Sequence, residues 1–545
     1  MALVALGKSE PRTTPFPKLV NDHRLTRRRG LARYQPPSQA ISWTHGGSAD
    51  MKENAASVRS DIKLAHADRF YIDGKWVKPS TGASIEVIDT ATEEPFLRVA
   101  AAAKQDMSDA IDAARRAFDS GPWPRMKPAE RAKYLRAIAA GIRSRQGIMT
   151  EIWSRESGVV LSTSQYGMDM LPLQYERYAD LAETFPFDER AEITQGKGTD
   201  AWIVREPVGV VGAIIPWNAP ALLTAIKLAP ALLAGCTMVL KAAPEGPGNI
   251  NLMAEIAHEA GLPPGVLNVL TAERDVSELL VSDARIDKIA FTGSTVTGRR
   301  IAAVCAERIG RYTLELGGKS AAIIMDDFDL QRAADILSRE ECYLAGQVCS
   351  SLTRIIVDRK RHDEMVDRLA ATFSKVRVGD PLDPTSEMGP LVSRRQRDRA
   401  LGLIERGRSE GSRLATGGGQ PAHLNRGWFI EPTVFGNVSN DSTLGREEVF
   451  GPVLSVIPSD GVEDAIRIAN DTIYGLNGSV FTNDLKDAEK VLRRLRTGTA
   501  GHNDHHTDLG IAFGGFKQSG VGREGGREGL LPYLETKTMI LDAAI

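Results

Sequence analysis

Between residues 208 and 291, short apolar runs alternate with amphipathic stretches, and this alternation constrains the fold more than any other feature of the chain. Strands are expected at 208–215, 237–240, 266–270 and 288–291, with helices between them at 221–233, 250–260 and 276–281. Such repetition is typical of a parallel, doubly wound sheet. Ligands of these sheets bind beyond the carboxyl ends of the strands, so the first candidates for a site follow the strands, at 216–218, 241–245 and 292–295.

A second α/β stretch, from about 320 to 508, predicts a separate domain. It has expected strands at 321–324, 353–357 and 453–457 and long charged helices near 331–343 and 361–376. Ahead of both stretches we expect a hairpin at 70–77 around Asp73-Gly74, and helices at about 107–118, 129–142 and 166–185.

The balance of charge excludes some functions. Of the 545 residues, 68 are Lys or Arg and 70 are Asp or Glu, which gives a net charge of -2 and argues against a nucleic-acid partner. No window approaches 18 uninterrupted apolar residues, so we expect no membrane span. The four cysteines (Cys236, Cys305, Cys342 and Cys349) match neither a disulfide framework nor a CxxC pair, which favours a reducing, cytoplasmic setting.

The first 60 residues differ from the rest, being rich in Arg, Pro and Ser and poor in acids. An organellar transit peptide would show amphipathic periodicity, and a twin-arginine signal would need an apolar segment after Arg27-Arg28-Arg29; neither pattern is seen. We therefore expect a disordered tail over 1–60, with Met51 as an alternative start of the working protein.

Glu315 and Cys349 are the two residues that best indicate catalysis. Glu315 lies in the glycine-rich run 313–319, and Cys349 follows it by 34 positions. A thiol is the side chain best able to attack an uncharged carbonyl at neutral pH, and a nearby carboxylate can take a proton from the thiol or from water. Taken singly, Cys349 is more typical of a buried small apolar residue and Glu315 of a solvated charge.

Two further motifs are weaker. The run Gly-Val-Gly-Arg-Glu-Gly at 520–525 fits the glycine fingerprint of dinucleotide sites, but no complete βαβ unit follows it. We expect it to be a turn that leads to a final strand at 534–541. His502, His505 and His506 lack the spacing of a helical zinc motif, so we expect a pocket lining or plain surface and predict no metal site.

Beyond the tail, over about residues 70–541, the sequence resembles the aldehyde dehydrogenase superfamily, and within it the hydrolytic, NAD(P)-dependent type. Six ordered motifs carry the resemblance: PWNAP at 216–220, FTGST at 291–295, LELGGK at 314–319, GQVC at 346–349, EEVFGP at 447–452 and FGGFKQSG at 513–520. The resemblance implies an α/β fold with a doubly wound parallel-sheet cofactor domain (61–187 and 207–317), an α/β catalytic domain (318–520) and a small β oligomerisation element (188–206 and 528–545).

The same resemblance implies the chemistry. Cys349 would attack an aldehyde carbonyl, and the side-chain amide of Asn218, with the backbone N–H of Cys349, would hold the oxyanion of the thiohemiacetal. Loss of hydride would leave a thioester, and Glu315 would activate the water that hydrolyses it to the acid. Lys227 matches a position implicated in proton relay, with an ordinary surface lysine as the alternative.

The cofactor implied is NAD, with NADP left open. Lys241 would reach the adenosine ribose, Gly293 and Ser294 would meet the pyrophosphate at a helix start, and Glu448 would bond the nicotinamide ribose. By the same carry-over, the other cofactor-binding residues are Ile214, Ile215, Pro216, Trp217, Pro244, Glu245, Leu316 and Phe450.

Three positions depart from the family pattern. Many NAD-using relatives have Glu three residues after the position of Lys241, where this chain has Pro244 followed by Glu245. If Glu245 takes over the ribose, like-charge repulsion of a 2′-phosphate favours NAD; if it points away, Lys241 accepts either dinucleotide. We favour NAD. The other departures are Leu344 in place of a frequent Asn and Ser351 in place of a very small or amide residue.

The substrate implied is a medium-sized neutral aldehyde, aliphatic or aromatic, because no arginine cluster occurs among the residues expected to line its tunnel. These include Ala219, Leu222, Tyr343, Val348, Ser350 and Phe513. The resemblance also implies a homodimer or homotetramer.

Two alternatives stay open. CoA-acylating relatives pass the thioester to CoA and commonly lack the glutamate matched by Glu315, whereas a non-catalytic structural or binding relative could lose Cys349, Glu315 or Asn218 freely. All three residues are present.

Overall fold

The computed structural model describes residues 59–198 and 200–542. Most of the predicted tail, including Met51, lies outside this range. Its last two residues belong to the folded body, because Arg59 forms an ion pair with Asp89 (2.9 Å) and the Ser60 hydroxyl donates to Glu151 (2.6 Å). The prediction of a tail is therefore wrong for 59–60.

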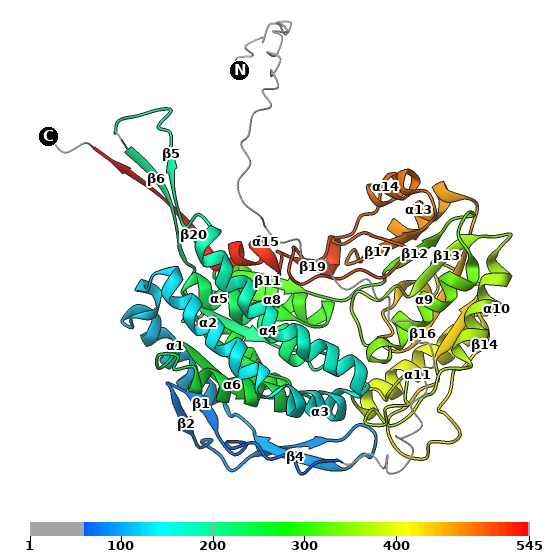
Figure 1. The fold of residues 1–545 in the computed structure, drawn as a ribbon, viewed down its shortest axis with the longest axis horizontal. Coiled ribbons are helices and arrows are strands. Elements are labelled where there is room, and N and C mark those ends of the chain that lie inside the picture. The colour runs from blue at the N-terminus through cyan, green and yellow to red at the C-terminus, as the bar shows by residue number, and fades with distance from the viewer. Residues whose placement is uncertain (1–58, 199, 543–545) are drawn as a thin grey trace, which may run out of the picture. The chain divides into compact units, whose positions relative to one another are not determined.

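The region that showed strand–helix alternation folds around an eight-stranded sheet (Figure 1). Its centre is parallel, as predicted, and antiparallel strands extend both edges. The strand order is β19 (Gly520–Val521), β11 (Arg311–Glu315), β10 (Lys288–Thr292), β7 (Val210–Ile214), β8 (Thr237–Ala242), β9 (Leu267–Thr271), β1 (Phe70–Ile72) and β2 (Lys75–Val77).

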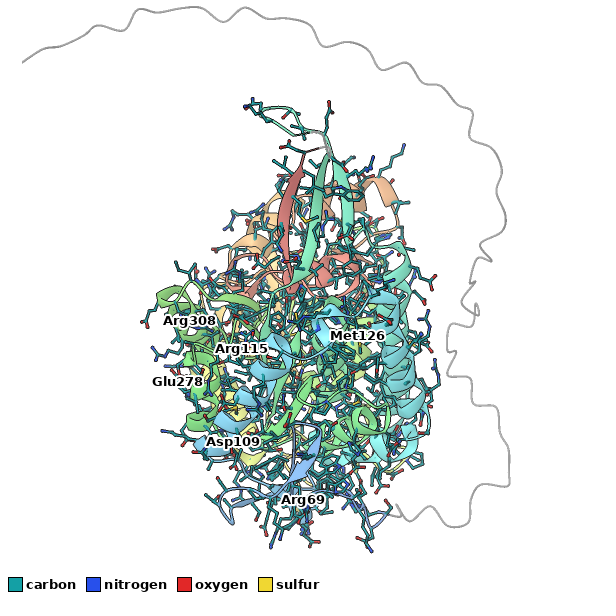
Figure 2. The ribbon with its side chains drawn as sticks, turned by 90° about the vertical axis from the view of Figure 1, so that its left-hand side faces the viewer. Arg69, Asp109, Arg115, Met126, Glu278 and Arg308 are labelled. Atoms are coloured by element: carbon teal, nitrogen blue, oxygen red, sulfur yellow. The ribbon has the colours of Figure 1, made fainter. Side chains whose placement is uncertain are left out.

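Helices cover both faces of this sheet because successive residues of a buried strand point to opposite sides. Val210 of β7 packs with one face, formed by α1 (Lys104–Asp119), α7 (Arg274–Ser282) and α8 (Thr295–Glu307), whereas Val211 packs with the other. Figure 2 labels residues on the first face, among them Arg115 of α1 and Glu278 of α7. The second face carries α2 (Pro128–Arg143), α3 (Gln146–Ser157), α4 (Leu161–Thr184), α5 (Pro220–Ala234) and α6 (Gly248–Glu259).

The second α/β stretch forms its own seven-stranded sheet and its own apolar core. The strand order is β14 (Arg413–Thr416), β15 (Thr433–Gly436), β16 (Val453–Ser459), β13 (Arg354–Asp358), β12 (Ala321–Ile324), β17 (Gly478–Phe481) and β18 (Gly501–His502). Its helices are α9 (Leu330–Cys342), α10 (His362–Phe373), α11 (Arg394–Ser409), α12 (Thr443–Arg446), α13 (Val462–Asn470) and α14 (Leu485–Leu492).

A separate antiparallel ribbon joins β5 (Asp188–Ala191), β6 (Asp200–Pro207) and β20 (Leu534–Leu541), and it extends away from the helical layers in Figures 1 and 2. The predicted strand segment 528–545 is wrong at its start, because 528–533 belong to α15 (Gly526–Leu530) and the 3-10 turn η4 (Leu531–Tyr533). A two-stranded sheet of β3 (Ser84–Ile88) and β4 (Pro95–Ala100), and the 3-10 turns η1 (Trp123–Arg125), η2 (Tyr343–Gly346) and η3 (Lys517–Ser519), complete the elements.

The glycine run at 520–525 is more than the predicted turn. Its first two residues form β19, which pairs with Leu314 and Glu315 at the edge of the first sheet. In the part of the chain that the structure describes, no helix is long and apolar enough to cross a membrane.

Candidate active site

Cys349 lies just after a tight, left-handed turn between α9 and β13. Leu344, Ala345 and Gly346 have φ values of 52°, 51° and 70°, a conformation that residues with side chains rarely adopt. A Cβ on Gly346 would lie 2.4 Å from backbone atoms of Gly451, so only glycine fits there. Leu344, which replaces a frequent Asn, is buried and packs in the core of the first sheet.

The amide of Asn218 is fixed beside this turn. Its Nδ2 donates to the backbone oxygen of Gln347 (3.0 Å), and the Gln347 side chain donates to the oxygen of Leu344 (3.0 Å) and accepts from the N–H of Val392 (2.9 Å). Trp153 holds the backbone of Asn218 with an indole hydrogen bond of 2.8 Å. The predicted oxyanion donor and the nucleophile turn therefore form one hydrogen-bonded unit.

Burial, together with the carboxyl groups of Glu448 and Glu315, raises the pKa of the Cys349 thiol to about 12, while the backbone N–H groups of Cys349 and Ser350 oppose the shift. At neutral pH the thiol is therefore protonated, and attack on a carbonyl requires a group that takes its proton. Cys349 is partly buried, whereas the other three cysteines are fully buried, as expected for inert thiols.

Glu315 ends β11 inside a buried acidic and basic cluster. Its pKa lies well above the usual carboxyl value because of burial and because of a second buried acid, Glu524. Glu524 accepts a hydrogen bond from Lys227 Nζ (2.7 Å), which also donates to Thr292 (2.6 Å). The side chains of Lys227 and Glu524 are 0% and 1% exposed, so a surface lysine at 227 is ruled out.

Glu524 is the residue of this cluster that the sequence did not single out. It lies in the glycine run first interpreted as a turn, and its backbone exchanges hydrogen bonds with Phe513 (2.7 and 2.8 Å). The sequence signal that could have identified it was an acidic residue inside the glycine run 520–525.

The residues expected to bind a dinucleotide line the carboxyl ends of the parallel strands. Lys241, near the end of β8, is only 7% exposed, and burial lowers its pKa to about 8. No hydrogen bond of its ammonium group to another described residue is found. A buried ammonium group without a partner is costly unless a ligand supplies one. Ser294 caps α8 by accepting from the N–H of Thr297 (3.3 Å), which leaves an anion-binding helix start beside Gly293.

The opposite wall comes from the second sheet. Burial raises the pKa of Glu448 to about 7, and its carboxyl group accepts from the N–H of Gly318 (2.9 Å). A Cβ on Gly317 would lie 2.5 Å from the same carboxyl group. The rings of Trp217 and Phe450 meet edge to face at 5.4 Å. A largely buried lysine, a helix start and a carboxyl group at opposed walls fit a dinucleotide.

The remaining cofactor candidates divide into two groups. Ile214, Ile215, Pro216 and Leu316 lie at or just after the carboxyl ends of β7 and β11. Pro244 and Glu245 follow β8, and the Glu245 carboxyl group forms an ion pair with Arg395 of α11 (2.9 Å). Glu245 is thus paired with a cation that was not among the predicted site residues.

The substrate candidates fall on both sides of Cys349. Ala219, Leu222, Tyr343 and Val348 are partly buried against the core of the first sheet. Ser350 is 2% exposed, and its hydroxyl lies 3.0 Å from Nε2 of His505, whose Nδ1 lies 3.6 Å from the carboxyl group of Glu340. Among the described residues, no group of three or more His, Cys, Asp or Glu could hold a metal ion.

Known proteins resemble this chain over most of its length. Residues 76–539 match the model of the aldehyde dehydrogenase family. The chain is 41% identical to a geranial dehydrogenase of Castellaniella defragrans over 472 residues, covering 86% of this chain and 98% of the relative. It is 40% identical to betaine aldehyde dehydrogenase 1 of Oryza sativa, covering 86% and 94%.

Solved structures are equally similar. An aldehyde dehydrogenase of Mycobacterium tuberculosis in complex with NAD+ matches with a TM-score of 0.85 and 43% identity, over 88% of this chain and 99% of that one. A mutant of aldehyde dehydrogenase C of Pseudomonas syringae, in complex with NAD+ and octanal, matches with a TM-score of 0.85 and 35% identity, over 90% and 100%. Because the family model matches residues 76–539 and relatives of 40% identity or more align over most of both chains, the chain belongs to the aldehyde dehydrogenase family.

Proposed function

We propose that the protein oxidises its aldehyde through a covalent intermediate on Cys349, which Glu315 then helps to hydrolyse. The reaction class, oxidation of an aldehyde to the carboxylic acid by an NAD(P)-dependent enzyme, follows from family membership. The observation that carries the residue roles is the position of Glu315: its charge acts on the Cys349 thiol and it shares a buried cluster with Glu524 and Lys227.

Attack begins with removal of the thiol proton. Because the pKa of Cys349 is raised to about 12, the nucleophile forms only as its proton passes to a base. In the buried cluster of Glu315, a second acid, Glu524, is held by Lys227. Burial raises the pKa of Glu524, and Lys227 opposes this shift, which favours the ionised form of Glu524. An ionised Glu524 can therefore take up a proton inside the same buried cluster as Glu315.

Asn218 stabilises the negative oxygen of the thiohemiacetal. Its amide needs little reorganisation, because Gln347 holds the amide and Trp153 holds the Asn218 backbone, and a preorganised donor is worth about 3 kcal/mol to a developing oxyanion. NAD, when bound, would accept a hydride from the thiohemiacetal carbon. Loss of that hydride converts the thiohemiacetal to a thioester on Cys349. Glu315 then takes a proton from the water that attacks this thioester, and the acid is released with Cys349 restored.

For the substrate we propose a medium-sized neutral aldehyde. The apolar side is formed by Leu222, Tyr343 and Val348, and the polar side by Ser350 and His505. Among relatives, one is named for geranial and another for betaine aldehyde, and a solved structure contains octanal. The neutral apolar aldehydes suit this lining better than a quaternary ammonium aldehyde.

Assembly and compartment are proposed on separate grounds. The outer strand β20 exposes Met539, Ile540 and Leu541 along a ribbon whose edges can pair with another copy, which supports a homodimer or homotetramer. Four free cysteines support a reducing compartment, and we propose the cytoplasm, although some relatives are named as peroxisomal or chloroplastic.

The test is steady-state absorbance at the NADH band with a panel of aldehydes, each with NAD and with NADP, with and without CoA. CoA-independent reduction with acid as the product is expected. Reduction only with CoA would assign the protein to the acylating branch, and retained turnover in Cys349→Ala would move the nucleophile elsewhere.

A further inference from the structure

The ion pair between Glu245 and Arg395 lies where a dinucleotide would present its adenosine ribose. In doubly wound sheets the ribose is recognised after the second strand of the first βαβ unit, where a carboxylate binds the 2′-hydroxyl of NAD and an arginine accommodates the 2′-phosphate of NADP. Here β7, α5 and β8 form that unit, and Lys241 and Glu245 lie at and just beyond its end. We call Lys241, Glu245, Glu273 and Arg395 the adenosine edge.

Lys241 indicates that this edge is built for a ligand. Its side chain is more than nine-tenths buried, and no described residue is found to accept a hydrogen bond from its ammonium group. The charges of Glu245 and Glu273 both raise the pKa of Lys241 against the effect of burial. Glu245 is also close to the dinucleotide wall, since a Cβ on its neighbour Gly246 would lie 3.4 Å from the Cα of Trp217.

Arg395 is a second cation at this edge, and it comes from the part of the chain that forms the seven-stranded sheet and its helices. It belongs to the first turn of α11, whose start is fixed by the Ser393 cap and by Gln396, which donates to the oxygen of Phe450 (2.8 Å). The first turn of α11 has no acid, and cations at a helix start oppose the helix dipole. A locally unfavourable choice of this kind is expected where a residue serves binding rather than folding.

The charges at the edge decide what can bind. Two cations face two carboxyl groups, so a 2′-phosphate with its charge of about -2 meets no net repulsion. Without Arg395 the two carboxyl groups would dominate and exclude it, and the Arg395 side chain, 83% exposed, is free to turn from Glu245 to a phosphate.

We propose that Arg395 is a specificity-determining residue that neutralises Glu245 and receives the 2′-phosphate of NADP, so that the protein uses NADP as well as NAD. The inference rests on the proposed function, because it assumes that the adenosine edge serves the dehydrogenase reaction. It goes against the sequence-based preference for NAD over NADP, in which Glu245 would repel the 2′-phosphate.

The test separates adenosine recognition from catalysis. Binding of 5′-AMP and of 2′,5′-ADP to the full chain is measured by isothermal titration calorimetry, and the ratio of the two affinities is compared between variants. In Arg395→Ala we expect this ratio to shift about fivefold against 2′,5′-ADP, the loss of one charge-assisted contact. Arg395→Glu should shift it further, and Glu245→Gln should shift it toward 2′,5′-ADP.

Arg394→Ala is the matched control. Arg394 lies next to Arg395 in the same turn, but it forms its ion pair with Glu93 (3.0 Å), which is not part of the adenosine edge. A shift of less than threefold in Arg395→Ala, or an equal shift in Arg394→Ala, overturns the proposal.

A second measurement is the ratio of kcat/KM with NADP to that with NAD, which should fall in Arg395→Ala in parallel with the binding ratio. If no aldehyde is oxidised, the proposed function fails while the calorimetric ratio still decides the role of Arg395. If aldehydes are oxidised and the ratio does not move, only the role of Arg395 fails.

Discussion

Around Cys349 the groups that the mechanism uses are mostly buried and held by several partners, whereas around Lys241 the selective groups reach the surface and share one ion pair. Glu315, Glu524 and Lys227 are at most 2% exposed, but Arg395 is 83% exposed. Desolvation makes each buried charge depend strongly on its neighbours, while solvent screens the exposed pair. Chemistry is therefore fixed in one region, and cofactor choice is adjustable in the other.

The sharpest test of the buried region is Cys349→Ala. We expect turnover to fall by at least about a thousandfold, because no other partly buried thiol is available among the described residues. NAD binding, measured by calorimetry, should persist, since the dinucleotide wall lies on other residues. Loss of folding, read from circular dichroism, would instead give Cys349 a structural role.

Glu315→Gln should lower steady-state turnover by about 10²- to 10⁴-fold and spare a first burst of NADH in stopped-flow absorbance. A base works only when ionised, so the raised pKa of Glu315 predicts that wild-type turnover increases with pH above the usual carboxyl range. The variant should lose this increase. An equal loss of burst and steady-state rate would make Glu315 the activator of the thiol only.

Asn218→Ala should reduce kcat by about a hundredfold, with a smaller effect on KM, because its amide acts on the oxyanion and not on the bound aldehyde. Steady-state kinetics with the best aldehyde of the panel measures this split. A change confined to KM would show that Asn218 only positions the substrate.

Lys227→Met leaves Glu524 buried without the cation that donates a hydrogen bond to it. Breaking a buried pair in this way costs about 3 kcal/mol, which should lower the urea midpoint of unfolding. The double variant Lys227→Met with Glu524→Gln should recover part of the loss. No recovery would mean that Lys227 stabilises the fold through Thr292 instead.

A change of salt concentration should have the smallest effect of these tests, and it probes only the exposed ion pair of Glu245 and Arg395. Raising NaCl from about 50 to 500 mM should lower the affinity for 2′,5′-ADP about two- to threefold more than that for 5′-AMP, because screening weakens the contact to Arg395. Arg395→Ala should show less of this difference. The same salt dependence in the variant would contradict a contact at Arg395.

The sheets were predictable because they follow from local patterns. The run 208–215 became β7 at Val210–Ile214, and the run 288–291 became β10 at Lys288–Thr292. Buried parallel strands need continuous apolar residues, and these are visible in any window of the chain. The placement of Cys349, Asn218 and Glu315 around one site was expected through the family motifs.

Pairs far apart in the chain were not predictable. Lys227 and Glu524 are 297 positions apart, and Glu245 and Arg395 are 150 apart. No spacing rule relates such residues, because only the folding of two sheets against each other brings them together. For the same reason, the contact of His505 with Ser350 could be expected only as a general pocket lining.

The pairing of β20 with β6 has a practical consequence for handling the protein. β20 follows directly from α15 and η4, and this segment begins immediately after Glu524 and Gly525. A fusion tag or a truncation at the C-terminal end would act on the strand that anchors this segment, and through it on the acid beside Glu315. An affinity tag on this enzyme therefore belongs at the N-terminal end.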